Sequence, residues 1–212
     1  MKTRNKVLLT LACALLLVAG SVAGTLAWLT STSTVTNTFT VGQVKITLDE
    51  TKVNEYGVKQ DETRVTRNTY KLIPGHTYVK DPIIHVSADS ENCYLFVKIE
   101  NGLAAILDTK IIEKQMEDKG WKPLNENGNP GVYYYAGTGT GATDMKSVEK
   151  NANVPVFESF KLKGADVTAE TLSSYGTNTP IVVTAYAIQT DGFAANAPAA
   201  AWAALNPTTG TT

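Results

Sequence analysis

Cysteine is almost absent from this 212-residue chain, and that absence limits how the fold can be stabilised. Only Cys13 and Cys93 are present, and Cys13 lies inside a long apolar run near the N-terminus. A single remaining cysteine cannot form an intrachain disulfide, so burial of apolar side chains must hold the domain together. Cys93 alternates with Leu95, Val97 and Ile99, which predicts a small buried side chain rather than a reactive thiol.

The chain also lacks an excess of positive charge. It has 19 basic and 20 acidic residues, and three of the basic ones, Lys2, Arg4 and Lys6, precede Val7. The rest of the chain therefore carries 16 basic and 20 acidic groups. We do not expect a nucleic acid partner, because phosphate binding is driven by clustered Lys and Arg.

Recognisable motifs of catalysis are missing as well. HExxH, GxSxG, a Walker loop and CxxC do not occur, so we predict no catalytic residue and no cofactor. His76 and His85 are the only histidines and are weak candidates for a metal site. A zinc ion would need a third ligand, for which Asp81 or Asp89 is near enough in sequence. We interpret both histidines as surface or loop residues, and the glycine-rich stretch 137–141 as a loop.

The N-terminus has the three parts of a secretory signal peptide. Met1–Lys6 is basic, residues 7–23 are mostly apolar, and small residues crowd the end of the run. Cleavage is predicted after Ala27, so that the mature chain begins at Trp28, with Ala23 as a second possible site. An uncleaved membrane anchor is the alternative, since the run is long enough to cross a bilayer. Cys13 lies in the middle of the run, where a lipid-attachment cysteine is not expected.

Alternating apolar residues after the signal peptide predict a series of short strands. Thr and Ser dominate residues 31–41, in which Val35, Asn37, Phe39 and Val41 share one face. Further strands are predicted at residues 44–48, 83–86, 93–100, 132–136, 154–162 and 181–190, with a loop or weak edge strand in 49–68. Leu72-Ile73-Pro74-Gly75 predicts a turn.

Helical spacing appears in two places. Residues 103–119 predict one amphipathic helix that ends near Gly120, and the Ala-rich residues 194–212 predict a short helix after Pro198. Tyr133, Tyr134 and Tyr135 should alternate between the two faces of their strand. Short strands are separated by turn residues at regular intervals, and alternating βα units are absent. This pattern predicts a mainly β fold, an antiparallel jelly roll or β-sandwich with one inserted amphipathic helix.

Several segments, taken in order, resemble the family of the biofilm fibre protein TasA and of camelysin. The first is the junction Gly24-Thr25-Leu26-Ala27-Trp28-Leu29-Thr30. It is followed by Phe39 and Gly42, which match the family's Phe–x–x–Gly turn. The others are Leu72-Ile73-Pro74-Gly75 with the pair Lys80-Asp81, the strand 93–101, and the strand 181–190 with Gly192-Phe193. The middle of the chain, residues 103–149, matches only as an insertion that contains a helix.

The resemblance implies a jelly-roll subunit that is exported with the signal peptidase SipW. It divides the chain into a signal peptide (1–27), a donor strand segment (28–41), a jelly-roll domain (42–193) and an Ala-rich tail (194–212). Fibre-forming members donate their N-terminal strand to the next subunit, which assigns this role to Val35, Asn37, Phe39 and Val41. The expected partner is then a second copy of the chain, with membrane contact only through the signal peptide before cleavage.

The resemblance also implies the place of the protein and two alternatives to a fibre subunit. The expected location is the extracellular matrix or cell surface of a Gram-positive-type bacterium. Camelysin members suggest a surface metalloprotease as one alternative. The sequence does not support that activity, because it contains no recognisable zinc motif. The third possibility is a surface protein that caps or anchors a fibre without polymerising.

Overall fold

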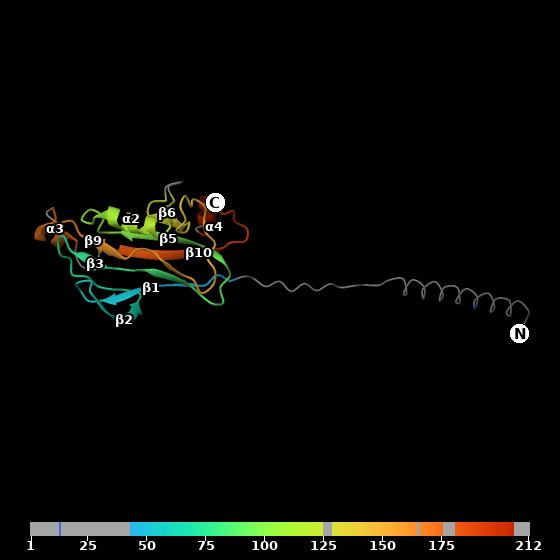
Figure 1. Cartoon of the computed structure of the whole chain (residues 1–212), viewed down its shortest axis with the longest axis horizontal. Helices are drawn as coiled ribbons and strands as arrows, with labels where there is room; N and C mark the ends of the chain where they lie inside the picture. Colours follow the sequence, from blue (N-terminus) through green and yellow to red (C-terminus); the bar gives the residue numbers. More distant parts are fainter. Residues whose placement is uncertain (1–12, 14–42, 125–128, 165, 176–180, 206–212) are drawn as a thin grey trace, which may run out of the picture. The chain divides into compact units, whose positions relative to one another are not determined.

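The computed structural model describes residue 13 and residues 43–124, 129–164, 166–175 and 181–205. The chain divides into two units, Met1–Thr40 and Val41–Thr212. The fold described below is that of the second unit, most of whose helices and strands are labelled in Figure 1.

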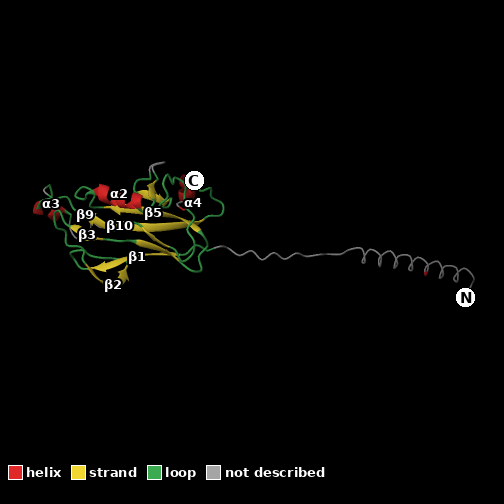
Figure 2. Ribbon diagram, viewed as in Figure 1, coloured by secondary structure: helices red, strands yellow, loops and turns green. Residues whose placement is uncertain are grey.

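Antiparallel strands make up most of this unit (Figure 2). The first sheet has the strand order β2-β1-β4-β8, with β1 at Ile46–Val53, β2 at Lys59–Val65, β4 at Ile83–Val86 and β8 at Asn153–Pro155. The second has the order β10-β5-β7-β6, with β5 at Cys93–Asn101, β6 at Trp121–Pro123, β7 at Val132–Tyr135 and β10 at Ile181–Gln189. A small third sheet pairs β3 (Thr77–Val79) with β9 (Ser159–Lys161). The predicted mainly β sandwich is therefore confirmed.

The main core lies between the two large sheets. It joins Ile84 and Val86 from β4 to Leu95 and Val97 from β5, and each of these side chains is at most 2% exposed. The first five residues of β5, from Cys93 to Val97, are all buried, as the apolar residues on both faces of this strand predict. Burial of this kind is the main source of stability, at about 25 cal/mol for each Å² of apolar surface removed from water.

A second apolar cluster covers the outer face of the sheet that contains β5. Helix α4 (Pro198–Leu205), the helix expected after Pro198, places Trp202 against Phe96 and Tyr186. The ring centroid of Trp202 is 5.7 Å from that of Phe96 and 5.0 Å from that of Tyr186. Tyr134 belongs to this cluster, whereas Tyr133 and Tyr135 pack on the main core. The predicted alternation of the three tyrosines is confirmed.

The amphipathic helix is present but shorter than predicted. Helix α2 spans Thr109–Asp118 and buries Ile112 and Met116, whereas residues 103–106 form turns and Leu107 forms an isolated β-bridge with Leu162. Ile106 and Asp108 hydrogen-bond through their backbones to residues 163 and 161, next to β9 and within it. These bonds to a distant strand replace the helical ones, although the apolar spacing continues. A short helix that was not predicted, α3 (Ala169–Ser174), begins at Thr168, whose side chain accepts a hydrogen bond from the Thr171 backbone N–H.

The single strand predicted at residues 154–162 is wrong, because the chain forms two strands there. β8 pairs with β4 and β9 pairs with β3, so the two lie in different sheets. Val156 and Phe157, between them, are consecutive and both 0% exposed. Two neighbouring buried side chains break the period of two, so the chain must turn from one sheet to the other.

Gly120 tests how tightly the end of α2 is packed. It has a φ of +89°, and a Cβ placed there would lie 2.4 Å from the backbone carbon of Gly137. We expect Gly120→Ala to lower the free energy of unfolding by about 3 kcal/mol or more, since the left-handed conformation alone costs about 1–2 kcal/mol. Gly192→Ala is the matched control, because Gly192 has a φ of +93° and nothing within 4 Å. Denaturant unfolding measures both, and equal losses would contradict the packing argument.

Candidate functional site

Among the described residues, strand β10 forms an open edge of the second sheet. It pairs with β5 along its whole length, from Ile181 opposite Asn101 to Gln189 opposite Cys93, and it ends the strand order β10-β5-β7-β6 (Figure 1). Its sequence, IVVTAYAIQ, contains no charge and no proline. Proteins normally protect an exposed edge strand with charged residues or proline, because the unpaired backbone groups of an apolar strand can pair with a further strand.

The burial of side chains changes abruptly between β5 and β10. On the face toward the main core, Leu95 and Val97 of β5 are 0% exposed. Their partners on β10, Ala187 and Ala185, point into the same core but are only half-buried. Val183 and Ile181 continue this half-buried row, opposite the partly buried Ile99 and Asn101. No residue of β10 is fully buried, although its sequence is as apolar as that of a central strand. The core is therefore incompletely covered along this edge.

The first sheet is open at the same side of the sandwich. β1 is the strand of the first sheet that lies against β10. Its first half, from Ile46 to Asp49, pairs with β4, whereas only its second half, from Glu50, pairs with β2. Ile46 and Leu48 are half-buried, although Ile84 of the neighbouring β4 is 0% exposed. Within the part of the chain that the structure describes, two backbone edges without a partner strand thus lie next to each other, and both carry apolar, half-buried side chains.

An edge of this kind is the feature that strand addition requires. Backbone N–H and C=O groups of an edge strand provide affinity, and pockets for alternate side chains provide specificity. The residues assigned to donation, Val35, Asn37, Phe39 and Val41, lie outside the described residues, as do Ala27 and Trp28 at the predicted cleavage site. The donor assignment and the cleavage site stay predictions.

The pair Lys80-Asp81, which carries part of the family resemblance, anchors the middle of β1. The Lys80 Nζ atom lies 2.6 Å from a carboxylate oxygen of Glu50. Asp81 accepts hydrogen bonds from the backbone N–H and the hydroxyl of Thr51, at 2.6 and 2.7 Å. Arg64 of β2 donates to the Asp81 carboxylate at 3.4 Å. These contacts hold the central part of the β1 backbone in place beside the open edge.

A second polar group connects β1, β2, β4 and the start of β8. Asp49 accepts hydrogen bonds from Arg64 Nε, at 2.5 Å, and from His85 Nε2, at 2.9 Å. Burial by itself raises the pKa of Asp49, but the hydrogen bonds and charges of His85 and Arg64 outweigh it and lower this pKa below 3.8. The carboxylate therefore stays ionised at neutral pH, and the contacts serve the sheet.

The two histidines are placed apart from the ligands that were considered for a metal. His76 Nε2 lies 2.9 Å from the backbone oxygen of Tyr56, and His85 Nδ1 lies 2.6 Å from Asn153 Oδ1. Asp81 contacts Thr51 and Arg64, and Asp89 pairs with Lys45. Among the described residues, no three His, Cys, Asp or Glu side chains form a group that could hold a metal ion.

Cys93 is buried, as its place in the alternation predicts. The residue is 0% exposed, and burial raises the pKa of its thiol to about 11. A raised pKa keeps the thiol protonated and unreactive at neutral pH. Residues 137–141 form turns and bends between β7 and β8, so the predicted loop is confirmed.

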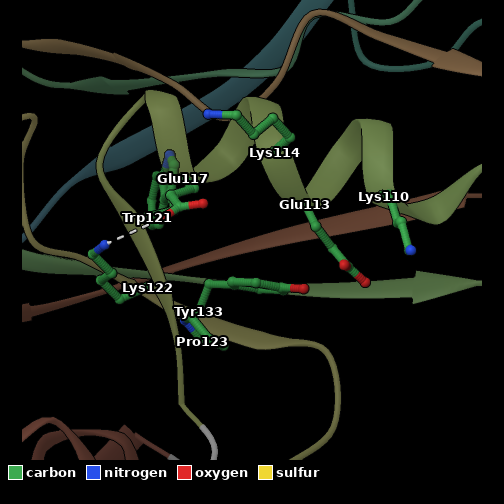
Figure 3. A pocket seen from close by; sticks show the side chains of 8 residues that line it. All are labelled: Lys110, Glu113, Lys114, Glu117, Trp121, Lys122, Pro123 and Tyr133. Atoms are coloured by element: carbon green, nitrogen blue, oxygen red, sulfur yellow. Dashed lines mark ion pairs between the residues drawn. The ribbon is translucent and has the colours of Figure 1, made fainter.

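A hollow of about 640 Å³ lies beside α2, as Figure 3 shows. Lys122 Nζ is 3.9 Å from Glu117 across it. The lining mixes both signs of charge and pairs no nucleophile with a base, so it suggests no reaction. Its residues are Lys110, Glu113, Lys114, Glu117, Trp121, Lys122, Pro123 and Tyr133.

The described part of the chain is an antiparallel β-sandwich in which β10 is an edge strand. Comparison with protein family models, with curated proteins and with solved structures found no match. No helix in the described part of the chain is both long and apolar enough to cross a bilayer.

Proposed function

We propose that this chain is an exported structural protein that polymerises into a surface or matrix fibre by strand donation. Residues 28–41 of one copy would pair with the open edge of β10 in the next copy. The proposal depends mainly on one observation, that the apolar strand β10 ends its sheet in the described part of the chain with no residue fully buried, even at Ala185 and Ala187 opposite the fully buried Val97 and Leu95.

The proposed donor and acceptor are chemically matched. Residues 31–41 contain no charge and no proline, and neither does β10. A donated strand could place its apolar row, which includes Phe39 and Val41, against the uncovered core, while its backbone pairs with β10. The donor segment becomes an N-terminus only after signal peptide cleavage, which would restrict assembly to exported protein.

Deletion of the donor segment tests this proposal. We expect purified protein that begins at Trp28 to form filaments in electron micrographs, and protein that begins at Gly42 to stay monomeric. A synthetic peptide of residues 28–41 should bind the shortened protein and raise its melting temperature, because it supplies the missing strand. A peptide of the same composition in scrambled order is the control.

Two results would count against strand donation. Filaments formed equally by both proteins would show that residues 28–41 are not required. Monomers in both, with no effect of the peptide, would favour an accessory protein that caps or anchors a fibre made of other subunits.

A further inference from the structure

Three polar side chains that the fibre proposal does not use lie in contact next to β1. Glu50 lies on β1, Asn68 follows β2, and Lys80 precedes β4. One carboxylate oxygen of Glu50 accepts from Lys80 Nζ at 2.6 Å, and the other accepts from Asn68 Nδ2 at 2.9 Å. The Lys80 and Glu50 side chains are only 11% and 6% exposed. A single buried carboxylate therefore holds an amine and a primary amide side by side.

Hydrogen bonds fix the orientation of the Asn68 amide. Its oxygen accepts from the backbone N–H of Val53 at 3.0 Å, and its nitrogen also donates to the backbone oxygen of Thr51 at 2.8 Å. The donor at the oxygen polarises the carbonyl and would stabilise negative charge that develops there. The oxygens of Glu50 and Thr51 that accept from the amide nitrogen hold it in place, and this nitrogen is the leaving group in any attack on the amide carbon.

Aromatic side chains lie next to this group of residues. Tyr70 follows Asn68 by two residues and packs edge-on against Tyr78 and Phe160, with ring centroids 5.6 and 5.2 Å away. Burial raises the pKa of the Tyr70 hydroxyl, and the charges of Glu50 and Asp81 raise it further. Exclusion of water strengthens electrostatic interactions and protects a reacting amide from hydrolysis.

We propose that Lys80 and Asn68 join in an intramolecular isopeptide bond, with Glu50 as the acid–base group. Glu50 takes a proton from the Lys80 ammonium, and the free amine attacks Cγ of Asn68. The tetrahedral intermediate collapses as Glu50 passes this proton to Nδ2 and the Cγ–Nδ2 bond breaks. Glu50 then takes the second proton from the Lys80 nitrogen and gives it to the departing ammonia, so that ammonium leaves and Glu50 is regenerated as a carboxylate. One C–N bond forms and one breaks, so the step needs no oxidant, reductant or cofactor.

A buried ion pair alone explains the arrangement less well. Such a pair contributes little net stability, because the loss of hydration offsets the attraction. Lys98 and Glu100 form an ion pair at 3.0 Å with side chains 38% and 60% exposed, and no amide nitrogen is recorded on that carboxylate. The new bond gives the Asn68 amide a chemical role on the carboxylate that holds Lys80, in addition to its hydrogen bonds with the β1 backbone. The bond would close the loop 68–80 beside β1.

Mass spectrometry tests the proposal directly. We expect the measured mass of the purified protein to be lower by one ammonia, about 17 Da, than the mass calculated from its sequence. The calculation starts at the N-terminal residue that the purified protein has. Trypsin should release a branched peptide in which residues 68–71 are joined to residues 72–98, because modified Lys80 resists cleavage. Recovery of unmodified peptides 68–71 and 72–80 from the folded protein would overturn the proposal, whatever the variants do.

Three variants identify the bond. Glu50→Gln and Lys80→Met should each show the full mass and yield peptide 68–71 in free form. Lys98→Met, at the exposed ion pair, should keep the loss of ammonia. A loss that persists in Lys80→Met would show a different reaction, such as cyclisation of another asparagine, and would also overturn the proposal. These results do not depend on filament formation, so the isopeptide bond and the fibre role stand or fall separately.

Discussion

Val183→Asp is expected to abolish filaments, whereas Val182→Asp, one residue away, should leave them intact. Val183 points into the half-covered core, and Val182 points to the opposite face, where it is 38% exposed. Aspartate is too short to reach water from beneath an added strand, so a carboxylate at position 183 would remain in the apolar contact. Both variants introduce the same poor strand former in the same strand, which makes them a matched pair.

Mixing experiments separate a blocked edge from a misfolded protein. The Val183→Asp chain keeps its donor segment, so it should add to one end of wild-type filaments and stop their growth. The protein that begins at Gly42 keeps the acceptor edge but lacks the donor. Together these two non-polymerising proteins should form a one-to-one complex, which size-exclusion chromatography with light scattering can measure. Each alone should be a monomer with a cooperative thermal transition.

The opposite result would move the acceptor elsewhere. If Val183→Asp polymerises as well as Val182→Asp, then β10 is not the edge that receives the strand. The first half of β1, between Ile46 and Asp49, would then be the next edge to test, because it also lacks a strand on one side within the described residues.

Trp202→Ala should cause one of the largest losses of stability in the domain, about 3–5 kcal/mol. Trp202 is 7% exposed, packs on Phe96 and Tyr186, and donates its indole N–H to Asn129 Oδ1 at 3.1 Å. The only other buried residue of α4 is Ala201, which offers little surface to hold the helix. Loss of the indole should therefore release α4 and expose the outer face of β5.

Denaturant unfolding and hydrogen exchange measure this effect. The midpoint should fall sharply in Trp202→Ala, and the amides of α4 should exchange far faster than those of β5. Ala203→Ser is the control, since Ala203 is exposed on the same helix and the change costs only about 0.5 kcal/mol in helix propensity. A loss below about 1 kcal/mol in Trp202→Ala would mean that α4 does not stabilise the sheet.

Local sequence was sufficient for much of the fold, because its signals act over a few residues. Alternation at 83–86 and the apolar run at 93–97 predicted β4 and the buried start of β5. Pro74 and Gly75 predicted a turn that the structure contains, with Gly75 at a φ of +73°. Side-chain periodicity and turn chemistry depend on neighbours in the chain, so they can be seen without the tertiary structure.

Sheet membership could not be predicted in the same way. Residues 154–162 appeared to be one strand, because apolar residues follow one another there, but the chain crosses between sheets at Val156 and Phe157. The meeting of Glu50, Asn68 and Lys80 likewise depends on three segments that pairing brings together. Of these residues, only Lys80 belonged to a segment singled out by the resemblance.

The sequence by itself determined that both β5 and β10 are apolar strands, since each has a run of side chains that avoid water. Only the tertiary structure decided that the first five residues of β5 are covered on both faces and that β10 is left at an edge with no residue fully buried. The physical reason is that an apolar run specifies a need for burial, whereas the strand order specifies which neighbours supply it. At β10 that need is left partly unmet within the described part of the chain, and a strand from another copy could meet it.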